Sequence, residues 1–197
     1  MEAAVVVFGD YISPFSYLAE AVLARSRADG VRIERCAYEL WPAPVPLPEL
    51  AVQEPRGAFE ATVLPIAEQL GVEIRYPAIA TRTRKAHEAF AYARDAGRAE
   101  PMQDAIFRAY FIEGRDIGRI DELVAVGESV GLERTALKVA LDIDQYSERV
   151  DADRARAAAL GITAVPAFVR GGPYDRDVRL GLLEYDMLTA WLRGETE

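Results

Sequence analysis

Two serines three residues apart, in the segment Ser13-Pro14-Phe15-Ser16, have the types and spacing of a possible reactive site. They follow a short apolar run at 4–8 and a turn, so the Ser-Pro pair has the pattern of a helix start. A serine at the N-cap accepts a hydrogen bond from a free backbone N–H, and proline is tolerated at the first helical position. We therefore expect Ser13 to cap a helix and Ser16 to lie in its first turn.

The other reactive side chains are few. Cys36 is the only cysteine and His87 the only histidine of the chain. A single cysteine cannot form an internal disulfide, and a single cysteine and histidine do not give a metal-ligand cluster, so we expect neither intramolecular redox chemistry nor a bound metal. We expect Cys36 to be a small buried residue of a strand. We expect His87 to be a buried residue of a helical region, distant from Ser13.

Size and charge narrow the class of protein. The chain has 197 residues, of which 51% are hydrophobic and 28% charged, and this predicts a single globular domain over 1–197. The net charge of -9 disfavours nucleic acid, whose binding depends on lysine and arginine. The chain shows neither a basic leader followed by an apolar segment nor an apolar run long enough to span a membrane. We therefore expect a cytoplasmic protein without a nucleic-acid or membrane partner.

Hydrophobic patterns predict the order of the elements. Strands at 4–8 and 31–40 flank the helix that begins after Ser13, and this order implies a parallel pair. The alternation of the second strand breaks at Arg35. Proline occupies every second position of 42–48, which indicates an extended surface connection. Helical patterns follow at 57–70 (with a break at Pro65), 83–96, 102–112, 120–130, 134–140 and 145–160. A strand at 162–169 that contains Pro166, a turn at 171–174, a strand at 178–180 and a helix at 184–192 complete the chain.

This order of elements resembles the DsbA-like branch of the thioredoxin fold. Besides the Ser-Pro-Phe-Ser segment, the resemblance rests on Gly-Ile-Thr-Ala-Val-Pro at 161–166. Three stretches are also similar to FrnE-like proteins: Tyr38-Glu39-Leu40, Thr83-Arg84-Lys85-Ala86-His87 and the stretch 107–117. The resemblance covers nearly the whole chain. It implies an α/β thioredoxin fold with a large all-helical insertion at about 57–143, between an N-terminal βαβ part and a C-terminal ββα part.

The departure from that family lies at its redox motif, C-x-x-C, which here has serine at both ends. A hydroxyl cannot replace a thiolate in disulfide exchange. The segment is, however, similar to the S-P-Y-S-type motif of 2-hydroxychromene-2-carboxylate isomerases and kappa-class glutathione transferases. There a serine hydroxyl, backbone N–H groups and the positive helix end would stabilise a glutathione thiolate. The resemblance implies Ser13 and Ser16 as catalytic residues. It implies as ligand contacts Pro14, Phe15, Val165 and Pro166, with the last two joined by a cis peptide bond within reach of Ser13.

A second departure concerns the γ-glutamyl end of glutathione. Isomerase-like sequences carry a polar G-Q-D-R-type segment near the last helix, where this chain has Gly181-Leu182-Leu183-Glu184. Leucines cannot bind the charged γ-glutamyl group, although Glu184 or Asp186 is placed to reach its ammonium. Ser13 is then either a plain helix cap or a cap that also binds a thiol.

Two functions remain open at this point. One is an enzyme that uses a small thiol or glutathione in isomerase- or transferase-like chemistry. The other is a non-catalytic protein that has lost redox activity and binds an extended peptide or a partner beside Pro166. A homodimer is compatible with either function.

Overall fold

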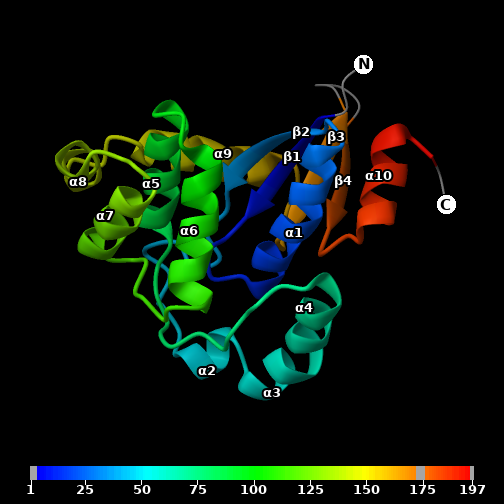
Figure 1. Ribbon diagram of the computed structural model, residues 1–197, viewed down its shortest axis with the longest axis horizontal. Coiled ribbons are helices and arrows are strands. Elements are labelled where there is room, and N and C mark those ends of the chain that lie inside the picture. The colour runs from blue at the N-terminus through cyan, green and yellow to red at the C-terminus, as the bar shows by residue number, and fades with distance from the viewer. Residues whose placement is uncertain (1–3, 172–175, 196–197) are drawn as a thin grey trace.

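A mixed four-stranded sheet forms the centre of the computed structural model, which describes residues 4–171 and 176–195 (Figure 1). The strands lie in the order β2-β1-β3-β4. Their bounds are Ala4–Gly9 for β1, Arg32–Ala37 for β2, Ala167–Gly171 for β3 and Arg176–Leu180 for β4. The predicted parallel pairing of β1 with β2 is confirmed, and Phe8 lies opposite Cys36 in that register. Strand β3 runs antiparallel to both β1 and β4.

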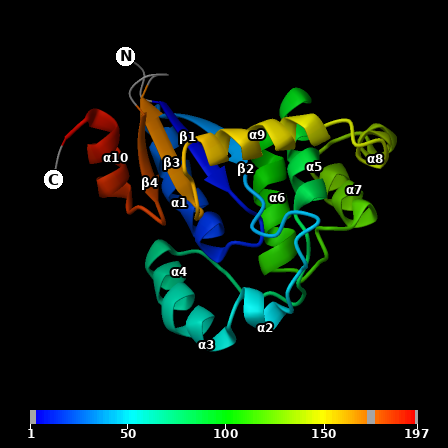
Figure 2. The same cartoon turned by 180° about the vertical axis from the view of Figure 1, so that it is seen from behind.

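Helices cover both faces of this sheet (Figures 1 and 2). Helices α1 (Pro14–Ala28) and α10 (Tyr185–Arg193) lie on one face, and α9 (Ser147–Ala159) lies on the other. The alternation of side chains along β1 supplies both interfaces, because Val5 and Val7 pack with α1 and α10 while Phe8 packs on the side of α9. Burial of each such side chain contributes about 1.5–3 kcal/mol to folding. The sheet therefore provides the surface against which α1 packs.

The remaining helices lie between β2 and β3 in the sequence. A group beside the sheet consists of α5 (Arg84–Asp95), α6 (Ala99–Phe111), α7 (Ile120–Ser129) and α8 (Arg134–Asp142). A second group, near the N-terminal end of α1, consists of α2 (Leu50–Gln53), α3 (Arg56–Ala58), the π-helical turn η1 (Phe59–Val63) and α4 (Leu64–Leu70). The stretch predicted as helical at 57–70, with a break at Pro65, is instead interrupted by the π-helical turn η1 and continues as α4 through Pro65. The short helix α2 was not predicted.

Aromatic side chains join the first of these groups to α1. Tyr17 of α1 stacks on Phe107 and Phe111 of α6, with ring centroids 5.1 and 5.4 Å apart. Tyr11, in the turn before α1, contacts Phe107 at 4.9 Å. Aromatic pairs of this kind contribute about 0.5–1.5 kcal/mol beyond the area that they bury. They hold α6 against the helix that carries the two serines.

Strands β2 and β3 depart most from their predicted bounds. Strand β2 ends at Ala37 rather than at residue 40, since Leu40 N–H donates to the side chain of Asp10 instead of joining the sheet. Strand β3 begins at Ala167, directly after Pro166, because proline has no N–H to give to a ladder. The Val165–Pro166 peptide bond is cis. The predicted turn at 171–174 falls largely on residues outside the described ranges.

Candidate functional site

Ser13 caps α1 as the sequence predicts. Its backbone is extended, with φ -85° and ψ 115°, and its Oγ accepts a hydrogen bond from the Ser16 N–H at 3.2 Å. The turn before the cap is closed by the Ser13 N–H, which donates to the Asp10 carbonyl at 3.0 Å. Pro14 follows at the first helical position. Local hydrogen bonding therefore places the Ser13 hydroxyl at the positive end of a 15-residue helix.

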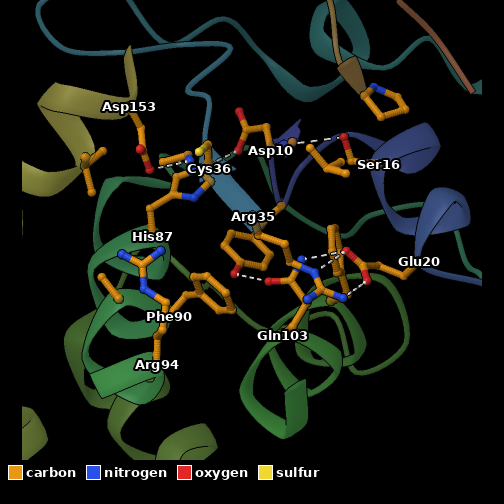
Figure 3. A pocket seen from close by; sticks show the side chains of 18 of the residues that line it. Asp10, Ser16, Glu20, Arg35, Cys36, His87, Phe90, Arg94, Gln103 and Asp153 are labelled. Carbon is orange, nitrogen blue, oxygen red and sulfur yellow. Dashed lines mark hydrogen bonds and ion pairs between the residues drawn. The ribbon is translucent and has the colours of Figure 1, made fainter. Parts of the chain in front are cut away.

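The two serines face different spaces. Ser13 lines a surface pocket of about 130 Å³ together with Pro14 and Phe15, and we call this the outer pocket. Its other walls are Ile12, Leu40, Trp41, Leu50, Gln53, Glu54 and Tyr110. Ser16 lines a separate space beneath the motif, which we call the inner cavity (Figure 3). The two serines of the motif therefore line two different spaces.

The outer wall of the outer pocket depends on one guanidinium group. Arg82 donates from Nη1 to the Trp41 carbonyl and from Nη2 to the Val45 carbonyl, both at 2.7 Å. These bonds fasten the proline-rich segment that follows β2. Arg82 lies just before α5, so a residue of the helical group positions the Trp41 side of the pocket.

The inner cavity has a volume of about 40 Å³, enough for about three water molecules. Besides Ser16, its walls include Asp10, Cys36, His87 and Pro166. Figure 3 shows the side chains of Asp10 and Ser16 at one end of this space and those of Phe90 and Arg94 at the other. Both Asp10 and Ser16 are almost fully buried. The other walls include the exposed Arg94 and the partly exposed Arg149 and Asp153, so the cavity runs from the buried Asp10 and Ser16 toward the surface.

Asp10 and His87 form a buried pair beside Ser16. The Asp10 Oδ2 accepts from the Leu40 N–H at 2.7 Å, while its Oδ1 lies 3.5 Å from His87 Nε2 and has no hydrogen-bond partner in the described part of the chain. The same Nε2 lies 3.1 Å from the Tyr38 carbonyl oxygen, which can only accept, so Nε2 carries a proton. The predicted burial of His87 is confirmed. The sequence analysis placed it away from Ser13 and did not anticipate that it shares the inner cavity with Ser16.

A buried polar network fixes α1 against its neighbours. Arg35 of β2 donates to both carboxylate oxygens of Glu20 in α1, at 3.1 and 2.7 Å. Gln103 of α6 donates to Glu20 at 2.8 Å and accepts from the Tyr11 hydroxyl at 2.6 Å. The Arg35 and Glu20 side chains are only 8% and 13% exposed. The sequence analysis did not identify this network, although the break in alternation at Arg35 was the signal for it.

The structure does not bring all predicted site residues into one space. Ser13, Pro14 and Phe15 line the outer pocket, whereas Ser16 and Pro166 line the inner cavity. Val165 lines neither and packs beside the sheet on the side of α9. The candidate thiol site is accordingly the outer pocket.

The residues considered for the γ-glutamyl group also lie elsewhere. Leu182 and Leu183 pack into the core, and Asp186 lines a separate surface pocket between β4 and α10. Glu184 lines none of these spaces and caps α10. The expectation that Glu184 or Asp186 serves the serine site is not met.

Comparison with known proteins identifies the family. The model of the DSBA-like thioredoxin domain matches residues 4–192. The uncharacterized protein YwbO of Bacillus subtilis is 31% identical over 177 residues, which cover 87% of this chain and 88% of YwbO. The chain belongs to the DSBA-like thioredoxin domain family. The predicted α/β thioredoxin fold with a helical insertion is thereby confirmed.

Solved structures of low identity share this DSBA-like fold. A probable DsbA oxidoreductase from Streptomyces coelicolor matches with a TM-score of 0.79 and 24% identity over 98% of this chain and 91% of its own. A 2-hydroxychromene-2-carboxylate isomerase matches with a TM-score of 0.76 and 23% identity over 97% and 93%. The cytosolic disulfide reductase DsbM from Pseudomonas aeruginosa matches with a TM-score of 0.71 and 18% identity over 98% of both chains. The fold thus occurs in oxidoreductases and in an isomerase.

The thiol of this DSBA-like domain is not placed for redox chemistry. Cys36 is buried in β2, as predicted, and burial is the main cause that raises the pKa of its thiol, with the charge of Asp153 adding to the effect. A buried neutral thiol is a poor nucleophile. Within the described ranges no group of three or more His, Cys, Asp or Glu side chains could hold a metal ion. No helix there is long and apolar enough to cross a membrane.

Proposed function

We propose that this DSBA-like domain binds a low-molecular-weight thiol, of which glutathione is the type, in the outer pocket and uses it in isomerase- or transferase-like chemistry on a small substrate. The observation that carries the proposal is the position of the Ser13 hydroxyl, at the start of α1 and on the wall of a surface pocket. A cytoplasmic location, where small thiols are kept reduced, fits this proposal.

The hydrogen bonds of Ser13 suit a thiolate ligand. Because its Oγ accepts from the Ser16 N–H, its own O–H remains able to donate to a sulfur atom in the pocket. The N–H of Phe15, at the second helical position, has no acceptor in the described part of the chain. Hydrogen bonds from these two groups, together with the positive end of α1, favour the thiolate over the thiol. Each unit by which they lower the pKa of the bound thiol corresponds to about 1.4 kcal/mol.

Thermal unfolding in the presence of reduced glutathione tests the proposal. A ligand that binds only the native state stabilises it by about 2.7 kcal/mol at one hundred times its dissociation constant. S-methylglutathione, which cannot form a thiolate, should give a smaller increase in Tm. The variant Ser13→Asp keeps a side chain that caps helices well but replaces the hydroxyl donor with a negative charge, so it should fold and lose the response.

A matched variant controls for loss of a hydroxyl. Ser129 lies on α7, where its Oγ donates to the Val126 carbonyl, far along the chain from the outer pocket. Ser129→Ala should therefore keep the response to glutathione. If reduced glutathione gives the wild type no increase in Tm at millimolar concentration, the thiol site is refuted.

A second candidate function rests on Val165. Its backbone N–H and carbonyl have no hydrogen-bond partner among the described residues, and its side chain is only partly buried. A free backbone of this kind can pair with an extended peptide. A non-catalytic peptide- or partner-binding protein is the function that we would propose if the glutathione experiment fails.

A further inference from the structure

The charged side chain that lines the outer pocket indicates a second property of the ligand, in addition to its thiol. Among the described residues that line the pocket, Glu54 is the only one with a charged side chain, and none is a lysine or an arginine. We infer that the outer pocket selects a thiol that also carries an ammonium group, and that the Glu54 carboxylate binds this group. The inference rests on the proposed thiol site and adds the class of ligand that the site accepts.

The backbone of Glu54 is held firmly at the wall of the pocket. Its N–H donates to the Leu50 carbonyl at 2.8 Å, and its own carbonyl accepts from the Tyr76 hydroxyl at 2.7 Å. The Glu54 charge contributes, after burial and the charge of Asp10, to the raised pKa of Tyr110. Tyr110 also lines the outer pocket, so the carboxylate lies within electrostatic reach of the pocket interior.

The Glu54 carboxylate has no partner in the described part of the chain. It takes part in none of the ion pairs or side-chain hydrogen bonds found there, and partial burial raises its pKa. Arg56, the cation nearest along the chain, is engaged elsewhere: its guanidinium lies 4.0 Å from the centre of the Tyr76 ring and 3.6 Å from Glu60. A partly desolvated carboxylate without a counter-ion gains most from a cation that enters with the ligand.

The aromatic walls of the pocket also favour a cation. Phe15, Trp41 and Tyr110 supply aromatic rings to its walls, and the faces of aromatic rings attract ammonium groups. The start of α1 at Ser13 offers the opposite polarity, which suits a thiolate. A ligand with a thiolate and an ammonium group therefore matches both the helix start and the Glu54 carboxylate that line the pocket.

The size of the pocket is consistent with such a ligand. Its volume of about 130 Å³ is below the range of about 300–1,000 Å³ that is usual for pockets of drug-sized ligands. The net charge of -9 adds a general repulsion of anionic thiols. The class of ligand is thus a small aminothiol, or the aminothiol-like end of a larger molecule.

Three small thiols that differ in charge test this inference. Cysteamine carries an ammonium group, 2-mercaptoethanol is neutral and 3-mercaptopropionate carries a carboxylate. We expect cysteamine to bind the wild type at least about fivefold more tightly than 2-mercaptoethanol, as measured by calorimetry, because a partly exposed ion pair contributes up to about 1 kcal/mol. We expect 3-mercaptopropionate to bind most weakly.

Two variants assign the preference to one carboxylate. Glu54→Gln keeps the shape of the side chain and removes its charge, so its preference for cysteamine over 2-mercaptoethanol should be about fivefold smaller than that of the wild type. Any preference that remains comes from the greater acidity of the cysteamine thiol, whose ammonium group lowers its pKa. Glu60→Gln removes an exposed carboxylate of the same segment that lies outside the pocket, so it should keep the fivefold preference.

The outcomes separate this inference from the proposed function. Equal binding of the three thiols by the wild type, or a preference as large in Glu54→Gln as in the wild type, would overturn the role of Glu54 and leave the thiol site in place. Failure of the wild type to bind any of the three thiols, and glutathione as well, would remove the thiol site and the inference together.

Discussion

Replacing both serines of the motif by cysteine tests how the start of α1 is built. The change is Ser13→Cys together with Ser16→Cys. The Ser16 N–H lies 3.2 Å from the Ser13 Oγ, so side chains at these two positions start close together at one helix end. We expect the two thiols to form a disulfide and the variant to gain dithiol redox activity, while the wild type has none.

The two cysteines of this variant should have different roles in disulfide exchange, because they face different spaces. Position 13 faces the outer pocket at the positive end of α1, which lowers the pKa of a thiol and makes it the attacking group. Position 16 faces the inner cavity, where the Asp10 carboxylate and His87 lie nearby. A thiol at position 16 is hidden from large substrates and can only resolve the mixed disulfide. Ser13→Cys alone should therefore react with a thiol reagent much faster than Ser16→Cys alone.

The expected change in stability follows from chain entropy. Closing a loop of only four residues lowers the conformational entropy of the unfolded state, which raises its free energy by about 2 kcal/mol at 25 °C. Loss of the Ser13 cap costs about 1 kcal/mol. The free energy of unfolding of the oxidised variant should therefore be about 2 kcal/mol higher than that of the reduced variant. It should be about 1 kcal/mol higher than that of the wild type.

Two assays measure these quantities. Reduction of insulin by dithiothreitol reports the redox activity, and urea denaturation of the oxidised and reduced forms reports the difference in unfolding free energy. Circular dichroism verifies that the variant has folded. A folded variant that does not form the disulfide would refute the assignment of residues 13 and 16 to the redox positions of the family.

Three further predictions concern the surroundings of the motif. Arg35→Met leaves the buried Glu20 carboxylate without its main partner and should lower the unfolding free energy by about 3 kcal/mol in urea; a loss below 1 kcal/mol would contradict the importance of the network. Because the folded state keeps the Cys36 thiol neutral, while the unfolded thiol ionises near pH 8.5, stability should fall as the pH rises above that value, and Cys36→Ala should remove this part of the pH dependence. Gly118→Ala would bring its Cβ into overlap with Thr81 Oγ1 and to 3.0 Å from a backbone carbonyl, and its Tm should fall by an amount equivalent to about 1–3 kcal/mol; an unchanged Tm would show that this turn can relax.

Local sequence patterns predicted the elements that carry the motif. The cap at Ser13, the parallel pair β1 and β2, and the helices α5 to α9 all follow from turn chemistry and hydrophobic periodicity. The helix α2 was missed because four residues are too few to show a period, and it follows a proline-rich segment. A break was predicted at Pro65, but the chain is helical through that residue, and the π-helical turn that precedes it has no separate signal in the sequence.

The division of the motif between two spaces could not be predicted from the sequence. It depends on α2 and Trp41 covering one side of the helix start, and on Asp10 and His87 closing the other. His87 is 74 residues from Ser13 in the chain, and its contacts with the Tyr38 carbonyl and the Asp10 carboxylate, which form only in the folded protein, bring it to the inner cavity. Residues that meet through tertiary packing leave no mark in local periodicity.

The two hydrogen bonds from Arg82 limit how far this protein can be shortened without changing the outer pocket. The sheet with α1, α9 and α10 contains the Ser13 cap, but the Trp41 side of the outer pocket is fastened by a residue that precedes α5. A minimal version of the protein, trimmed to its sheet and the helices on its two faces, would keep the serine and lose the shape of its pocket. A variant designed for a new ligand would therefore have to retain the helical insertion, because a residue of that insertion holds one wall of the outer pocket.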